Sequence, residues 1–289
     1  MPRYNHWESN EYARLNMLQQ TPLFNDRLLP DIRKGKVFVA IRKSKIDFYH
    51  VGRKLFSFDD RGFRSNIAYL DAYKNKPNGE VSESAFKDLE LCDSFYEGYP
   101  QIQKNTKLHI GRESEQVSEI WKRHSCCRNG ADPFIVLDIE LSLKAQDEGR
   151  TADQIDLILF DRDSQEIRFF EVKRFGNREI HLVQGHVAVV DQIGRYAKQV
   201  KTKHKSLLTG YKQYVRILNK LCGGDIPTPK SIDHRVDLLV FGFNSEERKR
   251  LKKIIIPEFS RRFHCSYRGK ANGASQETLA SWWRREQKQ

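Results

Sequence analysis

The chain has 289 residues, of which 31% are charged and 38% hydrophobic, and its 51 basic and 38 acidic side chains give a formal net charge of +13 at pH 7. Apolar segments with regular spacing run throughout, which excludes a disordered chain and predicts a globular protein of one large or two modest domains. The positive charge favours a polyanionic partner, with nucleic acid ahead of a membrane surface. No apolar run reaches the length of a transmembrane helix, so we expect no membrane association.

The cysteines and the N-terminus predict the compartment. The five cysteines form no C-x-x-C pair, which argues against a zinc ribbon or an iron–sulfur cluster, and their odd number favours reduced thiols. His124 beside Cys126 and Cys127 is a candidate metal ligand, but ordinary side chains near a helix end explain the three residues better. The first residues lack the apolar core of a secretory signal. We therefore expect a cytoplasmic protein, and a homo-oligomer is left open.

Residues 1–100 predict a β-rich N-terminal module that recognises a substrate or a partner. A short helix is expected over residues 8–20, and the apolar pattern then changes to a period of two. We expect strands over residues 36–42, 45–50, 53–58 and 63–70. The strands are rich in aromatic residues and their turns in basic ones: Phe38, Phe48, Tyr49, Phe56, Phe58 and Phe63, with Arg42, Lys43, Lys45, Arg53 and Lys54. The sheet either stacks bases and contacts phosphates or, as we favour, buries its aromatic row in a core.

Two helices are expected next. Residues 82–96 predict a helix capped by Ser82, with Pro100 beyond its end, and a second helix runs from Gly111 to His124. The buried stripe of the second helix is expected to comprise Val117, Ile120, Trp121 and His124. Glu113 lies one turn before this stripe on the same side. It is either a first-turn carboxylate favoured by the helix dipole or a residue that serves a site.

From residue 134 onward, apolar strands alternate with helices, which predicts an α/β fold. We expect a strand over residues 134–145, a hairpin over 153–174, helices over 187–200 and 207–221, and a buried central strand over 235–243. A basic helix capped by Ser245, a strand over 262–268 and a helix over 277–286 follow. Trp282 and Trp283 in the last helix either stack on bases or dock the helix, and we favour docking.

The hairpin carries the residues that most require a chemical explanation. If the segment 153–174 folds back at Asp163 and Ser164, Leu157 faces Phe170 and Ile158 faces Phe169. The same register places Asp156 opposite Glu171, with Lys173 two residues further along the same face. Two carboxylates and an ammonium are then neighbours beside apolar side chains.

Buried charges of this kind cost several kcal/mol unless they are paired or hold a metal. A divalent cation removes the repulsion between two carboxylates, and a nearby lysine positions or activates a water or stabilises phosphoryl charge. This is the equipment of metal-assisted phosphodiester hydrolysis. The simpler alternative is a structural ion pair on a half-buried hairpin.

With Gln192 and Tyr196 spaced four residues apart on the following helix, the order helix, strand, hairpin, helix, strand resembles the PD-(D/E)XK nuclease superfamily. Gln-x-x-x-Tyr after the Glu-x-Lys strand resembles its RecB-type branch. The resemblance covers residues 101–289. The residue before Asp156 is isoleucine rather than proline, a departure that is common in this superfamily.

The resemblance implies a restriction-endonuclease-like core, with a central mixed sheet flanked by helices. It implies Mg²⁺, for which Mn²⁺ substitutes, and no iron–sulfur cluster. The implied metal ligands are Asp156, Glu171, the carbonyl of Val172 and Glu113. Lys173 is implied to position or activate the attacking water, and Gln192 and Tyr196 to orient the site.

We therefore expect a Mg²⁺-dependent nuclease that acts on DNA, with a role in restriction or anti-phage defence. A catalytically inactive nucleic-acid-binding module on the same fold is the first alternative. A structural protein whose N-terminal sheet docks a partner is the second.

Overall fold

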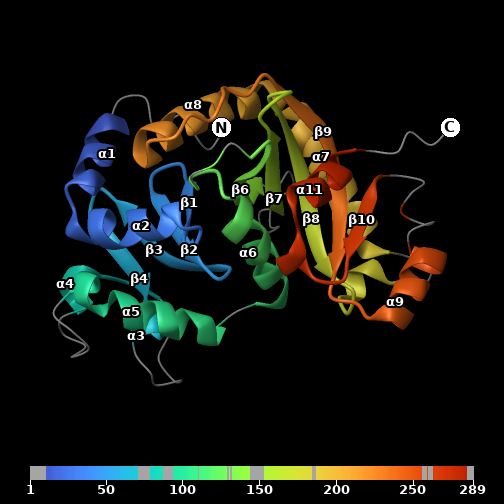
Figure 1. The fold of residues 1–289 in the computed structure, drawn as a ribbon, viewed down its shortest axis with the longest axis horizontal. Coiled ribbons are helices and arrows are strands. Elements are labelled where there is room, and N and C mark those ends of the chain that lie inside the picture. Colours follow the sequence, from blue (N-terminus) through green and yellow to red (C-terminus); the bar gives the residue numbers. More distant parts are fainter. Residues whose placement is uncertain are drawn as a thin grey trace. The chain divides into compact units, whose positions relative to one another are not determined.

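The computed structural model describes residues 11–70, 79–86, 94–109, 111–128, 130, 132–143, 153–183, 187–255, 259 and 263–284. The chain divides into two compact units, each with its own five-stranded sheet (Figure 1). Unit 1 comprises residues 1–130 and 209–228, and unit 2 comprises residues 131–208 and 229–289. The predicted boundary between residues 100 and 101 falls inside a helix of unit 1.

The sheet of unit 1 is an antiparallel meander in the order β1-β2-β3-β4-β5. Its strands are β1 (Phe38–Ile41), β2 (Ile46–His50), β3 (Arg53–Asp59), β4 (Gly62–Asn66) and β5 (Glu80–Ser82). The first three predicted strands are confirmed. The fourth is too long, because Asn66 Oδ1 accepts a hydrogen bond from the Ala68 amide at 2.9 Å and starts the short helix α3 (Ile67–Leu70).

The aromatic row of this sheet is a core. Phe48 and Phe56 are at most 1% exposed, and both rings pack against Phe63 at centroid distances of 6.0 and 5.9 Å. Phe95 and Tyr99 of the helix α5 (Phe95–Thr106) cover Phe56. The favoured interpretation is confirmed, because rings enclosed in this way offer no face on which bases could stack.

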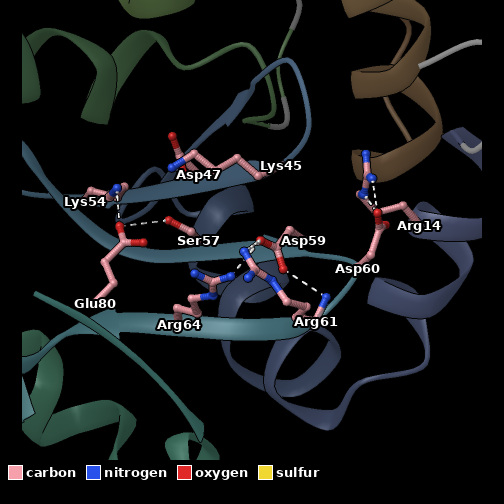
Figure 2. A network of polar contacts seen from close by, with 10 residues as sticks. All are labelled: Arg14, Lys45, Asp47, Lys54, Ser57, Asp59, Asp60, Arg61, Arg64 and Glu80. Atoms are coloured by element: carbon pink, nitrogen blue, oxygen red, sulfur yellow. Dashed lines mark hydrogen bonds and ion pairs between the residues drawn. The ribbon is translucent and has the colours of Figure 1, made fainter. Parts of the chain in front are cut away.

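The basic residues around the meander are largely paired within the unit. Figure 2 shows Lys54 pointing at Glu80, and Lys45 lies 3.3 Å from Asp47, which also pairs with the buried Arg42 at 3.6 Å. Further ion pairs hold the β3–β4 turn: Asp60 binds Arg14, and Asp59 binds Arg61 and Arg64 (Figure 2).

The helices of unit 1 differ from the expectation around Pro100. They are α1 (Glu11–Gln19), a π-helical turn (Leu23–Leu28), α2 (Leu29–Arg33), α3, α4 (Glu83–Phe86), α5 (Phe95–Thr106), a 3₁₀ turn (Lys107–His109) and α6 (Arg112–His124). Ser82 Oγ accepts from the Ala85 amide, as its predicted capping role requires, but α4 is short. A new helix, α5, begins after its own cap Ser94 and contains Pro100 in its second turn. Residues 87–93 of the helix predicted over 82–96 lie outside the described residues.

Helix α6 is confirmed, with Val117, Ile120, Trp121 and His124 all buried. The prediction of reduced thiols is wrong for two cysteines: Cys127, which follows α6, and Cys222, the last residue of helix α8 (His204–Cys222). Cys127 and Cys222 form a disulfide across a Cα–Cα distance of 5.7 Å and a sequence separation of 95 residues. Cys265 is a free thiol. The spacing along the chain held no sign of this pair, because the two cysteines meet only through the fold.

We expect the Cys222→Ser variant to lose about 2 to 4 kcal/mol of the free energy of unfolding, because the long loop it opens returns conformational entropy to the unfolded chain. The measurement is denaturant unfolding with and without dithiothreitol. Reductant should destabilise the wild type and a Cys265→Ser control equally, and should leave Cys222→Ser unchanged. Equal sensitivity of all three proteins to reductant would contradict the disulfide.

The sheet of unit 2 is mixed, in the order β10-β9-β8-β7-β6. Its strands are β6 (Phe134–Leu143), β7 (Asp153–Asp161), β8 (Glu166–Arg174), β9 (Ser231–Phe241) and β10 (Cys265–Arg268). Strands β6, β7 and β8 are antiparallel, whereas β8, β9 and β10 are parallel. The predicted hairpin register is confirmed, since Leu157 pairs with Phe170 and Ile158 with Phe169.

Helices cover both faces of this sheet (Figure 1). They are α7 (Ala188–Thr202), the start of α8 (His204–Cys222), α9 (Ser245–Arg250), a π-helical turn (Leu251–Ile255) and α11 (Gln276–Trp283), with 3₁₀ turns at Arg178–Ile180 and Ala271–Gly273. The cap of α9 is Asn244 rather than Ser245, because Asn244 and Glu247 form a reciprocal capping box. The predicted docking of the last helix is confirmed: Trp282 is 3% exposed against Phe241, and Arg168 lies over the ring of Trp283.

The molecule is therefore an α/β protein with one antiparallel and one mixed sheet, both flanked by helices. Within the part of the chain that the structure describes, no helix is long and apolar enough to cross a membrane.

Candidate functional site

The hairpin of unit 2 brings its two predicted carboxylates together at the point where β7 and β8 separate. Regular pairing of the strands ends at Leu157 and Phe170. One step beyond it, the Val172 amide donates a hydrogen bond to Asp156 Oδ2 at 2.8 Å, so this carboxylate takes the place of a backbone acceptor. Asp156 is thereby fixed by the strand opposite, next to Glu171. The register that buries the apolar face is the one that makes these acids neighbours.

Lys173 links two carboxylates. Its ammonium lies 2.9 Å from Glu171 Oε1 and 2.5 Å from Glu179 Oε2. The side chains of Lys173 and Glu171 are 8% and 2% exposed, whereas Glu179, in the 3₁₀ turn after β8, is 47% exposed. A buried lysine flanked by two acids is held in one position, which is the arrangement that an aligned water or a phosphoryl oxygen requires.

These neighbours set the charge state of Lys173. Burial alone would lower the pKa of its ammonium, but the attraction of Glu171 and the hydrogen bonds to Glu179 and Glu171 outweigh burial and raise the pKa above its ordinary value. The stability that the charged form contributes is complete below the ordinary lysine pKa and is lost only as the pH rises through the raised pKa. These contacts favour the charged form of Lys173. Positioning and activation of the attacking water both stay predictions.

Helix α7 supplies the other predicted pair. Gln192 Nε2 donates to the Tyr196 hydroxyl at 2.7 Å, which confirms that the two side chains share one face. Burial and the charge of Glu171 raise the pKa of Tyr196 to about 12, against the opposing hydrogen bonds from Gln192 and the backbone of Gln154. The phenol thus stays protonated at neutral pH. The Gln192 Oε1 atom is buried and accepts no hydrogen bond from the described residues.

Five predicted residues line a single cavity of about 550 Å³: Asp156, Glu171, Lys173, Gln192 and Tyr196. Sequence reasoning missed further charged residues in its wall: Asp153, Glu179, Asp191 and Arg195. Asp191 and Arg195 could have been predicted from the sequence, because each directly precedes Gln192 or Tyr196 on α7. Glu179 could not, because only its contact with Lys173 in the fold assigns it to the cavity. With five carboxylates against two cations, this wall is acidic on a strongly basic chain.

Glu113 is not among these residues. It lies in the first turn of α6, half-buried, and belongs to unit 1. This position agrees with the interpretation of Glu113 as a first-turn carboxylate that the helix dipole favours. A metal contact of Glu113, or of the Val172 carbonyl, stays a prediction.

The donor chemistry of the cavity fits Mg²⁺. Magnesium prefers hard oxygen ligands, typically one or two carboxylates completed by water, and Asp156 and Glu171 supply two carboxylates at adjacent positions. The buried oxygen of Gln192 adds an acceptor for a water. No group of three or more metal-binding His, Cys, Asp or Glu side chains occurs within the described ranges. Asp156 and Glu171 are the two carboxylates that would hold the ion.

Comparison with known proteins adds no relative: no family model, no curated protein and no solved structure matches the chain.

Proposed function

We propose that this protein is a Mg²⁺-dependent nuclease that hydrolyses phosphodiester bonds, with DNA as the favoured substrate, and that it is a member of the PD-(D/E)XK superfamily. The observation that carries the proposal is the hairpin register, which gathers Asp156, Glu171 and Lys173 at one cavity with Gln192 and Tyr196. The mixed sheet, with its parallel β8–β9 pair beneath α7, supports the proposed superfamily.

Each residue has a role that follows from its contacts. Asp156 and Glu171 would hold the metal, which supplies charge neutralisation at the phosphate and a water of lowered pKa. Lys173, fixed by Glu171 and Glu179, holds the attacking water or a phosphate oxygen. Tyr196, hydrogen-bonded to Gln192, is close enough to Glu171 for that charge to raise its pKa, so it is a positioning residue for the carboxylate.

The direct test is a cleavage assay of the purified full chain on linear duplex DNA, circular duplex DNA, single-stranded DNA and RNA. Each substrate is incubated with Mg²⁺, with Mn²⁺ and with EDTA. We expect cleavage of at least one DNA substrate with either metal, and none with EDTA. Cleavage that persists in EDTA, or no cleavage of any substrate with either metal, would refute the proposal.

An inactive nucleic-acid-binding protein is the second candidate, and the net charge of +13 favours it independently of the site. It predicts binding that weakens steeply with salt, without cleavage under any metal condition.

A further inference from the structure

A second cavity lies at the carboxyl ends of the parallel strands β9 and β10. Strand register relates it to the catalytic face: Lys173 pairs with Val240, and Val240 pairs with Tyr267. Residues that pair directly project from the same face of a sheet, and adjacent strands are separated by about 4.8 Å. Tyr267 therefore projects from the same sheet face as Lys173, about 10 Å away across β9.

The cavity combines aromatic and cationic side chains. It has a volume of about 530 Å³, and its wall includes Phe243, Arg248, Tyr267 and Arg268. The rings of Phe243 and Tyr267 lie 6.0 Å apart at a tilt of 56°, and both are half-buried. In contrast to the aromatic row of unit 1, these rings keep part of their surface open to solvent. Partly open rings of this kind are what a nucleobase stacks on.

The charges of this cavity are opposite to those of the catalytic one, because its wall contains two arginines and no carboxylate. Arg268 is largely occupied, since its guanidinium donates to Lys270 O, Gly273 O and Thr278 Oγ1. Arg248 is exposed and forms no ion pair with any described residue. It begins a run of exposed basic side chains on α9 and the turn after it: Arg248, Lys249, Arg250, Lys252 and Lys253.

We infer that this cavity binds one nucleotide of a single-stranded nucleic acid, with its base against Phe243 and Tyr267 and its phosphate at Arg248. The base must be unpaired to enter, so the site favours single strands and frayed ends over intact duplex. The choice of nucleic acid as the ligand rests on the proposed function. The shared sheet face would allow one strand to occupy both this site and the catalytic cavity.

The test measures binding without cleavage, by fluorescence anisotropy of a labelled 12-nucleotide single-stranded DNA in EDTA. The variants are Arg248→Ala, Tyr267→Leu and the control Arg250→Ala, which removes the same charge from the same exposed helix but lies outside the cavity. A second probe is an abasic oligonucleotide with the same number of phosphates. We expect about tenfold weaker binding for Arg248→Ala and for Tyr267→Leu, and less than a twofold change for Arg250→Ala.

The abasic probe separates stacking from charge. Wild type should bind the intact strand about tenfold more tightly than the abasic one, and Tyr267→Leu should lose this preference while Arg250→Ala keeps it. Equal losses for Arg248→Ala and Arg250→Ala, or equal binding of both probes by wild type, would overturn the inference. Binding that follows the expected pattern in a chain without cleavage activity would refute the nuclease and leave this site intact, so the two failures are distinguishable.

Discussion

Glu171→Gln and Asp156→Asn are each expected to reduce Mg²⁺-dependent cleavage by about 10³-fold, because each removes one of the two anionic oxygens that would hold the metal. The amide replacements retain size and keep an oxygen acceptor, so the hydrogen bond from the Val172 amide to position 156 survives. Asp156→Ala is a poorer test, because it also leaves that amide unpaired at a cost of about 1 to 3 kcal/mol. Cleavage is measured as initial rates over a range of Mg²⁺ concentrations.

The matched control is Asp163→Asn, which removes a carboxylate from the turn of the same hairpin, outside the cavity. It should cleave at the wild-type rate. Circular dichroism of all three variants should match the wild type, and thermal unfolding of Asp156→Asn and Asp163→Asn should match it to within about 1 kcal/mol. Glu171→Gln is expected to lose more stability, because it leaves the buried Lys173 ammonium paired with Glu179 alone. Wild-type cleavage by either Glu171→Gln or Asp156→Asn would exclude the metal-binding role assigned to that carboxylate.

Lys173→Met is expected to reduce cleavage about 10³-fold and also to lower the free energy of unfolding by about 3 to 5 kcal/mol. The loss of stability follows because Glu171 is 2% exposed and would be left beside an apolar side chain without its ammonium partner. Glu179 is a smaller part of the loss, because it is 47% exposed and screened by solvent. Stability is measured by urea unfolding at pH 7 and cleavage by initial rate.

A double variant separates the two effects. Glu171→Gln with Lys173→Met removes both buried charges, so it should recover most of the stability lost in Lys173→Met while staying inactive. Lys173→Arg keeps the charge and should keep stability better than Lys173→Met. If the double variant is as unstable as the sum of the single ones, the ion pair is not the source of the stability.

The pH dependence of cleavage tests whether Lys173 acts as a charged positioning residue or as a general base. Because the lysine pKa is raised, the ammonium is charged throughout the neutral range and its contribution does not titrate there. A rate that rises between pH 6 and 9 would therefore have to arise from a group other than Lys173. The same rise should persist, at a lower rate, in Lys173→Arg. Loss of the rise in that variant alone would restore Lys173 as a general base.

Local pattern was sufficient to predict the hairpin. Period-two alternation predicts which residues share a face, and the register that pairs Leu157 with Phe170 brings Asp156 beside Glu171 where regular pairing ends. The helical spacing of Gln192 and Tyr196 was equally local, and their hydrogen bond is present.

Contacts that depend on the path of the chain outside the regular helices and strands could not be predicted. Glu179 meets Lys173 only after the chain has left β8 and turned through residues 175–178. The Cys127–Cys222 disulfide joins residues 95 apart, and no spacing rule connects them. The strand predicted over residues 63–70 is too long for a different reason: the Asn66 side chain accepts a hydrogen bond from the Ala68 amide, and the strand ends there.

The disulfide also has a consequence for how the chain can be cut. The five predicted residues that line the candidate cavity all lie between Cys127 and Cys222, inside one covalently closed ring. A single peptide-bond break between these cysteines would yield two fragments that stay joined until a reductant separates them. Unit 2 also resumes after the ring, from residue 229, so no contiguous fragment contains one unit alone in full. A truncated chain that begins at residue 101 would keep the ring but discard the whole sheet on which unit 1 is built.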